Sequence, residues 1–215
     1  MADLVLHGYW RSSAAYRVRI ALNLKGLAYE QVTHNLRTAE QRAPGYLELA
    51  PQGLVPALQS GDVVLTQSLA IMEWLDETYP DPALLPKDAT GRAIVRAMAE
   101  AVACDIHPVN NLRILKALRS RFGADEAAVN AWVAEWVQEG FAGLEQLIAR
   151  HGGGFAYGDA PTLADCCLVP QVYNAERFGV DLGAYPHLLK AVERARALPA
   201  FQAARPEVQP DADVG

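Results

Sequence analysis

Two serines at the end of an apolar segment are the residues of this sequence best placed for chemistry. Ser12 and Ser13 follow a predicted strand at 4–9 and open a predicted helix that stops at Gly26. The first backbone N–H groups of a helix have no partner within it, and the helix dipole adds positive charge there. Such a position attracts an anion, for which a thiolate is one candidate. This segment contains no cysteine, so a thiolate bound here would have to belong to a ligand.

Composition and charge restrict the kind of protein and of partner. The chain has 215 residues, of which 51% are hydrophobic and 20% charged, as in an ordinary globular protein with one large or two small domains. It has 19 basic and 25 acidic residues, a net charge of −6, and no long run of lysine or arginine. We therefore expect neither nucleic acid nor a membrane as a partner. Because no secretory signal or membrane-spanning run is recognisable, the expected location is the cytoplasm.

Three cysteines, Cys104, Cys166 and Cys167, raise the question of a metal or redox site. No two of them form a C-x-x-C pair, their number is odd, and their spacing does not match a zinc site. Cysteine outside such sites is usually buried. We therefore expect no metal site, and we expect all three side chains to be small apolar residues of the core.

The first 80 residues alternate between predicted strands and helices. Apolar periodicity distinguishes the two, and Gly61-Asp62 is typical of a hairpin turn. The first strand, helix and second strand form a unit in which the strands should be parallel. Strands are predicted at 4–9, 29–33, 55–59 and 63–66, and helices at 14–25, around 46–49 and at 68–79. The order βαβαββα predicts a thioredoxin-like α/β domain over residues 1–80.

A proline-rich segment separates this domain from a helical remainder. Pro80, Pro82 and Pro86 break helix and strand alike, so residues 81–87 are predicted to be a linker. Residues 88–215 are predicted to form an all-helical domain with a surface tail at 205–215. Its helices are predicted at 90–121, 125–150, 162–178 and 186–198, with a buried stripe of Trp132, Trp136, Phe141, Leu144 and Ile148.

The start of the third of these helices carries a pattern that we assign to stability. Thr162 and Asp165 have the S/T-x-x-D spacing of a capping box. A capping box satisfies the unpaired N–H groups of its own helix and needs no ligand.

Several segments resemble the zeta class of the soluble glutathione transferases. A thioredoxin-like domain followed by an all-helical domain is the layout of the wider family, and the likeness to the class extends over nearly the entire chain. The segment 12–22 resembles the signature of the class closely, and further matches lie at 52–58, 67–71, 84–86, 105–113, 163–166 and 174–178. The sequence departs from the class at Ala14, where cysteine is usual, and at Ala50, where asparagine is usual. The first departure removes any role for a protein thiol at this site.

The resemblance implies a homodimeric, glutathione-dependent cis–trans isomerase that converts maleylacetoacetate to fumarylacetoacetate in aromatic amino acid catabolism. Glutathione would be the cofactor, and its thiolate would add reversibly to the double bond of a small dicarboxylate. The alternatives are a maleylpyruvate isomerase of gentisate catabolism and a transferase acting on α-haloacids. A binding module without catalysis is a further alternative, but it would be expected to lose the serine pair, Val55-Pro56 or Gln67-Ser68, and all are present.

By this resemblance, the first domain supplies most of the glutathione site. Ser12 or Ser13 would donate a hydrogen bond to the glutathione sulfur, and the pattern does not decide between them. Val55, followed by Pro56 in the cis form, would bind the cysteinyl part through its main-chain N–H and C=O.

Other positions match glutathione contacts of the class at its two ends. Gln67 and Ser68 open a helix and would bind the γ-glutamyl carboxylate, a role that Ser68 could combine with capping. Gln41 matches a glutathione contact but fits a solvated loop residue equally well. In the second domain, Asn110 and Asn111 match positions near glutathione.

The implied substrates are dianions, for which arginine is the expected ligand. Arg11, beside the serines, and Arg177 are favoured over Arg113, with a surface ion pair as the alternative for each. Arg17 and Arg19 belong to the signature segment, but we assign them a structural role.

His107 lies within about two helical turns of Asn110, Asn111 and Arg113. Burying this many polar side chains together is costly unless a ligand hydrogen-bonds them. We therefore expect these residues to line the substrate site. The alternative is an exposed helix face.

Overall fold

The chain folds into two compact units, which meet along the sequence within the predicted linker 81–87 but divide the last part of the chain differently from the prediction. The computed structural model describes residues 4–213. One unit extends to Leu84 and resumes at Ala197, and the other comprises Leu85–Arg196. The last segment of the chain therefore belongs to the thioredoxin-like unit and not to the helical one. There, α10 (Pro199–Ala204), which the sequence did not predict, packs against α1 (Ser13–Leu24).

A buried arginine holds this last segment on α1. Arg19 is 1% exposed, and its guanidinium donates to the carbonyl of Ala204 at 3.0 Å and to that of Trp10 at 2.9 Å. The contact satisfies a carbonyl at the end of a short helix, which has no partner within that helix. The tail is only partly at the surface, contrary to prediction, because Gln209 is buried and donates to two carbonyls of the same segment.

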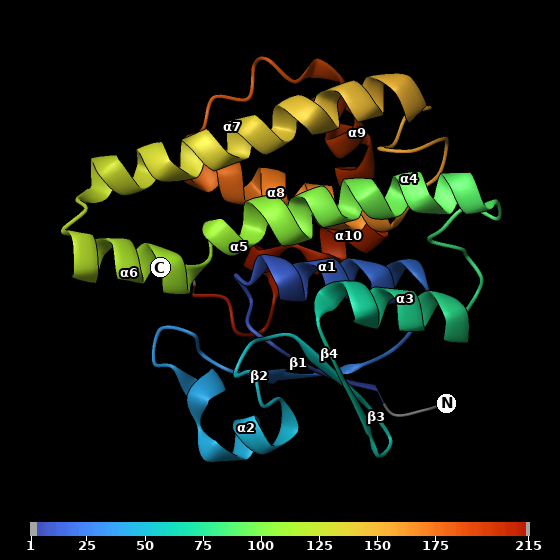
Figure 1. The fold of residues 1–215 in the computed structure, drawn as a ribbon. Coiled ribbons are helices and arrows are strands. Elements are labelled where there is room, and N and C mark those ends of the chain that lie inside the picture. The colour runs from blue at the N-terminus through green and yellow to red at the C-terminus, as the bar shows by residue number, and fades with distance from the viewer. Residues whose placement is uncertain (1–3, 214–215) are drawn as a thin grey trace. The chain divides into compact units, whose positions relative to one another are not determined.

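The N-terminal unit has the predicted thioredoxin-like order of elements (Figure 1). Its sheet has the strand order β2-β1-β3-β4. β1 and β2 are parallel, and β3 is antiparallel to both of its neighbours, which confirms the predicted parallel unit and hairpin. The elements are β1 (Leu4–Gly8), β2 (Glu30–Thr33), α2 (Pro44–Leu49), β3 (Ala57–Ser60), β4 (Val63–Thr66) and α3 (Ser68–Thr78).

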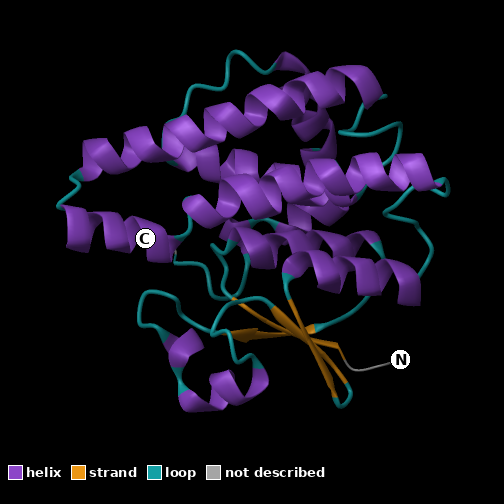
Figure 2. Cartoon of the chain, viewed as in Figure 1, coloured by secondary structure: helices purple, strands orange, loops and turns teal. Residues whose placement is uncertain are grey.

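Helices cover both faces of this sheet (Figures 1 and 2). On one face, Tyr46 of α2 and Ala50, the C-cap of that helix, pack against Ala57 of β3. Successive side chains of a strand point to opposite faces, so the fully buried Leu58 lies on the face covered by α1 and α3. The alternation thus places α2 apart from the other two helices.

The helical unit confirms the predicted helices except in its first part, where the single helix predicted at 90–121 is wrong. A π-helical turn, Ala101–Ile106, follows α4, and Pro108 has no N–H to continue the ladder. Asn111 is extended, and its side-chain oxygen accepts the N–H of Arg113 at 3.2 Å, so a new helix begins there. The helices are α4 (Ala89–Glu100), α5 (His107–Val109), α6 (Leu112–Phe122), α7 (Glu126–His151), α8 (Leu163–Arg177) and α9 (Pro186–Arg196).

Two predictions about the core of this unit are wrong in part. Trp132 and Trp136 are only half-buried, and the stripe of α7 continues instead through the buried Val129, Val133 and Val137. Cys166 and Cys167 are buried as predicted, but Cys104 is exposed. Cys104 lies in the π-helical turn, whose wider winding changes which residues face the core.

The predicted capping box at the start of α8 is confirmed. Asp165 is 1% exposed and accepts the N–H and the hydroxyl of Thr162, at 2.8 and 3.1 Å. The same carboxylate accepts the N–H of Ala156 at 2.8 Å, and so also fixes the loop before the helix. Burial raises the pKa of Asp165 to about 6, against the opposing effect of these hydrogen bonds.

Loss of the Asp165 carboxylate should therefore destabilise the chain strongly. Asp165→Ala leaves two buried N–H groups without an acceptor, and we expect the free energy of unfolding in urea to fall by about 3 kcal/mol. Asp165→Asn keeps one acceptor oxygen and should lose about half as much. Asp125→Ala, which removes the exposed cap of α7, is the matched control and should cost about 1 kcal/mol. Equal losses in Asp165→Ala and Asp125→Ala would contradict this assignment.

Candidate active site

The serine pair lies at the start of α1, as predicted. Ser12 is the N-cap, and its hydroxyl oxygen accepts the N–H of Ala15 at 3.2 Å. Ser13 is the first helical residue and is 7% exposed. A hydroxyl that accepts one hydrogen bond still has its own hydrogen to donate. Capping by Ser12 is therefore compatible with donation to an anion, and both hydroxyls lie at the positive end of the helix.

A buried arginine connects α1 to the start of α3. Arg17 is 2% exposed, and its Nη1 donates to the hydroxyl of Ser68 at 3.1 Å. Ser68 is the first residue of α3 and is 6% exposed. The contact supports the structural role assigned to Arg17, and it places a positive charge beside a second helix N-terminus.

The residue before Ser68 has an unusual backbone conformation. Gln67 precedes α3 with φ at +69° and ψ at 117°, although it is not glycine. Its side-chain amide donates to Oε1 of Gln52 at 2.7 Å. Gln67 is the N-cap residue of α3, but no side-chain hydrogen bond caps this helix, so Ser68 does not have the capping role that was considered for it. A non-glycine residue at positive φ costs about 1 kcal/mol or more and is often found at ligand sites. This strain supports Gln67 as a ligand contact.

Val55 and Gln41, the residues expected to contact the cysteinyl part and another part of glutathione, both have polar groups that the strands and loops do not use. The Val55–Pro56 bond is cis, as predicted. The ladder of β3 begins at Ala57, so the main-chain groups of Val55 lie outside it. Oε1 of Gln41 is buried and has no hydrogen-bond donor among the residues described. A buried acceptor without a donor is costly, which favours a ligand contact over a solvated loop residue for Gln41.

The two arginines favoured as carboxylate ligands each lie against the aromatic ring of a neighbouring residue. The guanidinium carbon of Arg11 is 5.3 Å from the ring centroid of Trp10, and that of Arg177 is 5.4 Å from the ring centroid of Phe178. Arg11 is partly exposed and Arg177 is exposed. A stacked guanidinium can still direct its N–H edge toward a carboxylate.

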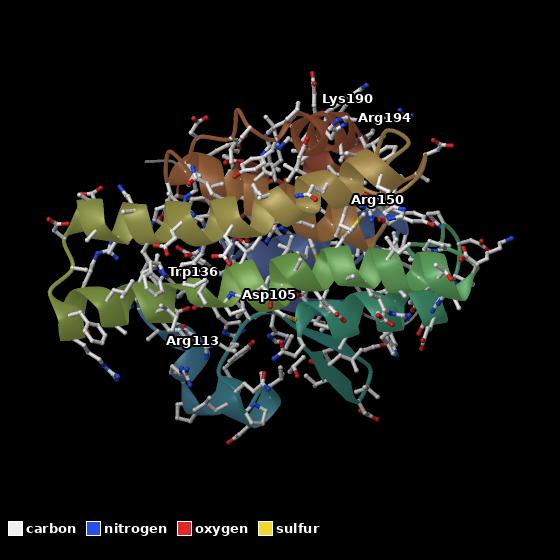
Figure 3. All side chains as sticks on the ribbon, turned by 45° about the horizontal axis from the view of Figure 1, so that its top comes forward. Asp105, Arg113, Trp136, Arg150, Lys190 and Arg194 are labelled. Carbon is white, nitrogen blue, oxygen red and sulfur yellow. The ribbon has the colours of Figure 1, made fainter. Side chains whose placement is uncertain are left out.

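In the helical unit, the predicted polar cluster gathers at the break between α5 and α6. Nε2 of His107 is 3.5 Å from Nδ2 of Asn111. Asn110 is 6% exposed, and within residues 4–213 neither atom of its side-chain amide has a hydrogen-bond partner. Arg113 lies on the exposed side of α6, at the same end of the unit as Trp136 (Figure 3). The buried amide therefore fits a ligand contact, whereas the exposure of Arg113 is compatible with a substrate contact as well as with a solvent-facing helix.

The charge of α6 was not predicted. Arg113, Lys116, Arg119 and Arg121 are all exposed, and this helix contains no acidic residue. None of the four forms an ion pair with another described residue. In a chain with a net charge of −6, this concentration of positive charge favours an anionic ligand nearby. The recurrence of basic residues three apart after Arg113 could have indicated it.

A group of aromatic rings on the face of the sheet that α2 covers was not predicted either. Nδ1 of His7 lies 3.0 Å from Nε2 of His34, and the ring centroids of His34 and Tyr46 are 4.2 Å apart. Burial lowers the pKa of both histidines, while the carboxylates of Glu30 and Glu40 act in the opposite direction. These residues are far apart in the sequence, so no local pattern could have brought them together.

The histidine pair should make stability depend on pH. In the unfolded chain the histidines have their ordinary pKa of about 6.5. Below that pH the unfolded chain therefore binds protons more readily than the native state, in which the pKa of both histidines is lowered. The free energy of unfolding should therefore fall as the pH drops below about 6.5. Urea unfolding at about pH 7.5 and pH 5.5 should show a smaller loss in His34→Gln than in the wild type. His187→Gln, which changes an exposed histidine of α9, should behave as the wild type; equal losses in all three proteins would exclude the effect.

Comparison with known proteins identifies the family of this chain. Residues 11–78 match the family model of the glutathione S-transferase N-terminal domain, and residues 128–203 match that of the C-terminal domain. A maleylpyruvate isomerase from Ralstonia sp is 54% identical over 209 residues, 96% of this chain and 98% of the relative. A holo structure of maleyl pyruvate isomerase, described as a bacterial zeta-class glutathione S-transferase, has 52% identity and a TM-score of 0.95, covering 97% of this chain and 99% of that one. The chain belongs to the zeta-class glutathione transferases.

A second solved structure of this family shows ligands. It is a maleylacetoacetate isomerase from Anaeromyxobacter dehalogenans with dicarboxyethyl glutathione and citrate in the active site, 47% identical with a TM-score of 0.88, covering 98% of this chain and 94% of that one. In the present chain, none of the helices within residues 4–213 is long and apolar enough to cross a membrane. Over the same residues, no group of three or more His, Cys, Asp or Glu side chains could hold a metal ion.

Proposed function

We propose that this chain is a glutathione-dependent cis–trans isomerase that converts maleylacetoacetate to fumarylacetoacetate. The observation that carries the proposal is the buried hydrogen bond from Arg17, in the second turn of α1, to Ser68, the first residue of α3, at 3.1 Å. It ties α1 to α3 within one unit, and the N-termini of these two helices would bind the thiolate and the carboxylate respectively. Dicarboxyethyl glutathione, the ligand of the relative from Anaeromyxobacter dehalogenans, is what thiol addition to a four-carbon dicarboxylic alkene would yield, which supports the same chemistry here.

The residues present fit glutathione. Gln67 and Ser68 would bind its γ-glutamyl carboxylate, because they combine a helix N-terminus with the positive charge of Arg17. The buried Oε1 of Gln41, which lacks a donor among the described residues, would accept an N–H of the tripeptide. Val55 would pair with the cysteinyl part through main-chain groups that lie outside the strand ladder.

The helical unit supplies further contacts to the bound molecules. The unsatisfied side-chain amide of Asn110 would hydrogen-bond glutathione or the substrate, together with its neighbour Asn111. His107 and Arg113 would contact the substrate, which as a dicarboxylate matches the positive charge of α6.

The reaction requires a nucleophile that can leave again. When bound, glutathione supplies a thiol that adds to the cis double bond and departs after rotation about the resulting single bond. The first N–H groups of α1, with the hydroxyl of Ser12 or Ser13, stabilise negative charge on the sulfur and so lower the pKa of the thiol. Arg11 and Arg177 bind the substrate carboxylates and offset the charge that develops on the conjugated carbonyl oxygen. With Ala14 in the signature, this helix start carries no protein thiol that could take the place of glutathione.

Removing the serine that donates to sulfur should raise the pKa of bound glutathione. We expect kcat/KM to fall about 100-fold in one of the variants Ser12→Ala and Ser13→Ala, by analogy with the loss of one hydrogen bond to a developing anion. The thiolate absorbance of the glutathione complex, followed against pH, measures the pKa directly. Ser12→Ala should in addition lower the free energy of unfolding by about 1 kcal/mol, because it removes the cap of α1. Wild-type pKa and rate in both variants would contradict the assignment.

Maleylpyruvate is the second candidate substrate, and the 54% identity to the Ralstonia sp enzyme favours it. The two substrates share the maleyl group and differ in the chain beyond it. Purified protein with glutathione should convert maleylacetoacetate to the fumaryl isomer, and assays of both substrates in parallel show which has the higher kcat/KM. An α-haloacid assayed in the same way tests the transferase alternative. If glutathione binds but neither maleyl substrate is turned over, the isomerase proposal is wrong.

A further inference from the structure

A tyrosine outside the predicted site hydrogen-bonds the main chain next to Val55. The hydroxyl of Tyr46, in α2, donates to the carbonyl oxygen of Leu54 at 2.7 Å. Tyr46 is 4% exposed, and burial raises the pKa of its hydroxyl to about 12. The hydroxyl therefore keeps its proton and remains a donor throughout the physiological range.

The carbonyl of Leu54 belongs to the same peptide group as the N–H of Val55. A peptide group is planar, and when it is trans its C=O and N–H point in opposite directions. The Leu54–Val55 bond is not one of the cis bonds of the structure. A hydrogen bond that fixes the direction of the Leu54 carbonyl thus also fixes the direction of the Val55 N–H. It further polarises the peptide group, which makes that N–H a better donor.

Tyr46 is itself held in place by its surroundings. Its ring belongs to a cluster with Ala50 and Ala57, against which the partly buried Val55 packs. On another side it meets the ring of His34, 4.2 Å away between centroids. The cluster that contains the Tyr46 ring thus packs against Val55, and the Tyr46 hydroxyl hydrogen-bonds the preceding carbonyl.

His34 is anchored to β1 by two separate contacts. Its Nε2 lies 3.0 Å from Nδ1 of His7, and its main-chain N–H donates to the carbonyl of Gly8 at 2.8 Å. A continuous series of contacts therefore runs from the central strand β1 through His34 and Tyr46 to the Leu54–Val55 peptide. Through these contacts the sheet restrains the orientation of that peptide group.

We propose that Tyr46 is a positioning residue for glutathione: it orients the Leu54–Val55 peptide so that the Val55 N–H is directed at the cysteinyl part of the tripeptide. The inference rests on the proposed function, because it is there that Val55 is assigned to glutathione. Tyr46 takes no part in the reaction itself. Its effect should therefore fall on the binding of glutathione and leave the rate at saturation nearly unchanged.

The test compares two variants that each lose one tyrosine hydroxyl. In Tyr46→Phe we expect the Kd for glutathione, measured by calorimetry, to rise about three- to tenfold, the effect of one neutral hydrogen bond. The kcat at saturating glutathione should stay close to that of the wild type. Tyr185→Phe is the matched control, because the hydroxyl of Tyr185 also donates to a main-chain carbonyl, that of Gln138 at 3.0 Å, in the helical unit. It should lose comparable stability without a change in Kd.

A measurement without ligand separates this inference from the proposed function. The ¹⁵N chemical shift of Val55 responds to hydrogen bonding at the Leu54 carbonyl and should change in Tyr46→Phe but not in Tyr185→Phe. If the wild type does not bind glutathione, the proposed function fails, and this inference with it. If the wild type binds and Tyr46→Phe binds equally well, the positioning role is wrong while the proposed function stands. Should Tyr46→Phe not fold, His34→Leu disturbs the same series of contacts, and an unchanged Kd in that variant would overturn the inference.

Discussion

The hydrogen bond from Arg17 to Ser68 is the interaction on which the arrangement of α1 and α3, and with it the proposed glutathione site of the N-terminal unit, depends. It joins the second turn of α1 to the first turn of α3 at 3.1 Å, between side chains that are both buried. A buried guanidinium is tolerated only where it is hydrogen-bonded, and removing its partner would leave a charge in the core. The two helix starts are therefore held at one separation. In the proposed function, Ser13 at the start of α1 and Gln67 at the start of α3 would act on a single extended ligand.

Polar groups that the described residues leave unsatisfied support two of the residues assigned to the ligand from the sequence. Nearly all buried polar atoms in proteins have a hydrogen-bond partner, so those without one among the described residues are informative. Gln41 and Asn110 are two such residues, one in each unit, and both had been assigned to glutathione from the sequence. The criterion is not specific to ligands, because Gln171 in α8 meets it as well.

The elements of the first unit followed from sequence patterns, and one helix of the second did not. Periodicity and turn residues in the segments 4–33 and 55–79 correctly predicted the strands, the helices and the pairing of the sheet. In the segment 90–121 the same periodicity predicted one helix, because apolar spacing does not register a π-helical turn followed by Pro108. That irregularity exposes Cys104 and lets Asn111 start a new helix. The sequence thus predicted which polar residues gather around His107, but it did not predict that the helix is interrupted there.

The sequence by itself determined what depends on near neighbours: the helix start at Ser12, the capping box at Asp165 and, through the family signature, the expected glutathione contacts. Only the tertiary structure decided which distant side chains meet. Arg19 reaches a carbonyl 185 residues away, and Tyr46 reaches from within α2 to the carbonyl of Leu54, in the segment that leads to β3. Such contacts follow from how sheet and helices pack, since residue types alone do not specify which buried donor finds which acceptor. The serines could therefore be found from the sequence, whereas the tyrosine that orients the Val55 peptide required the fold.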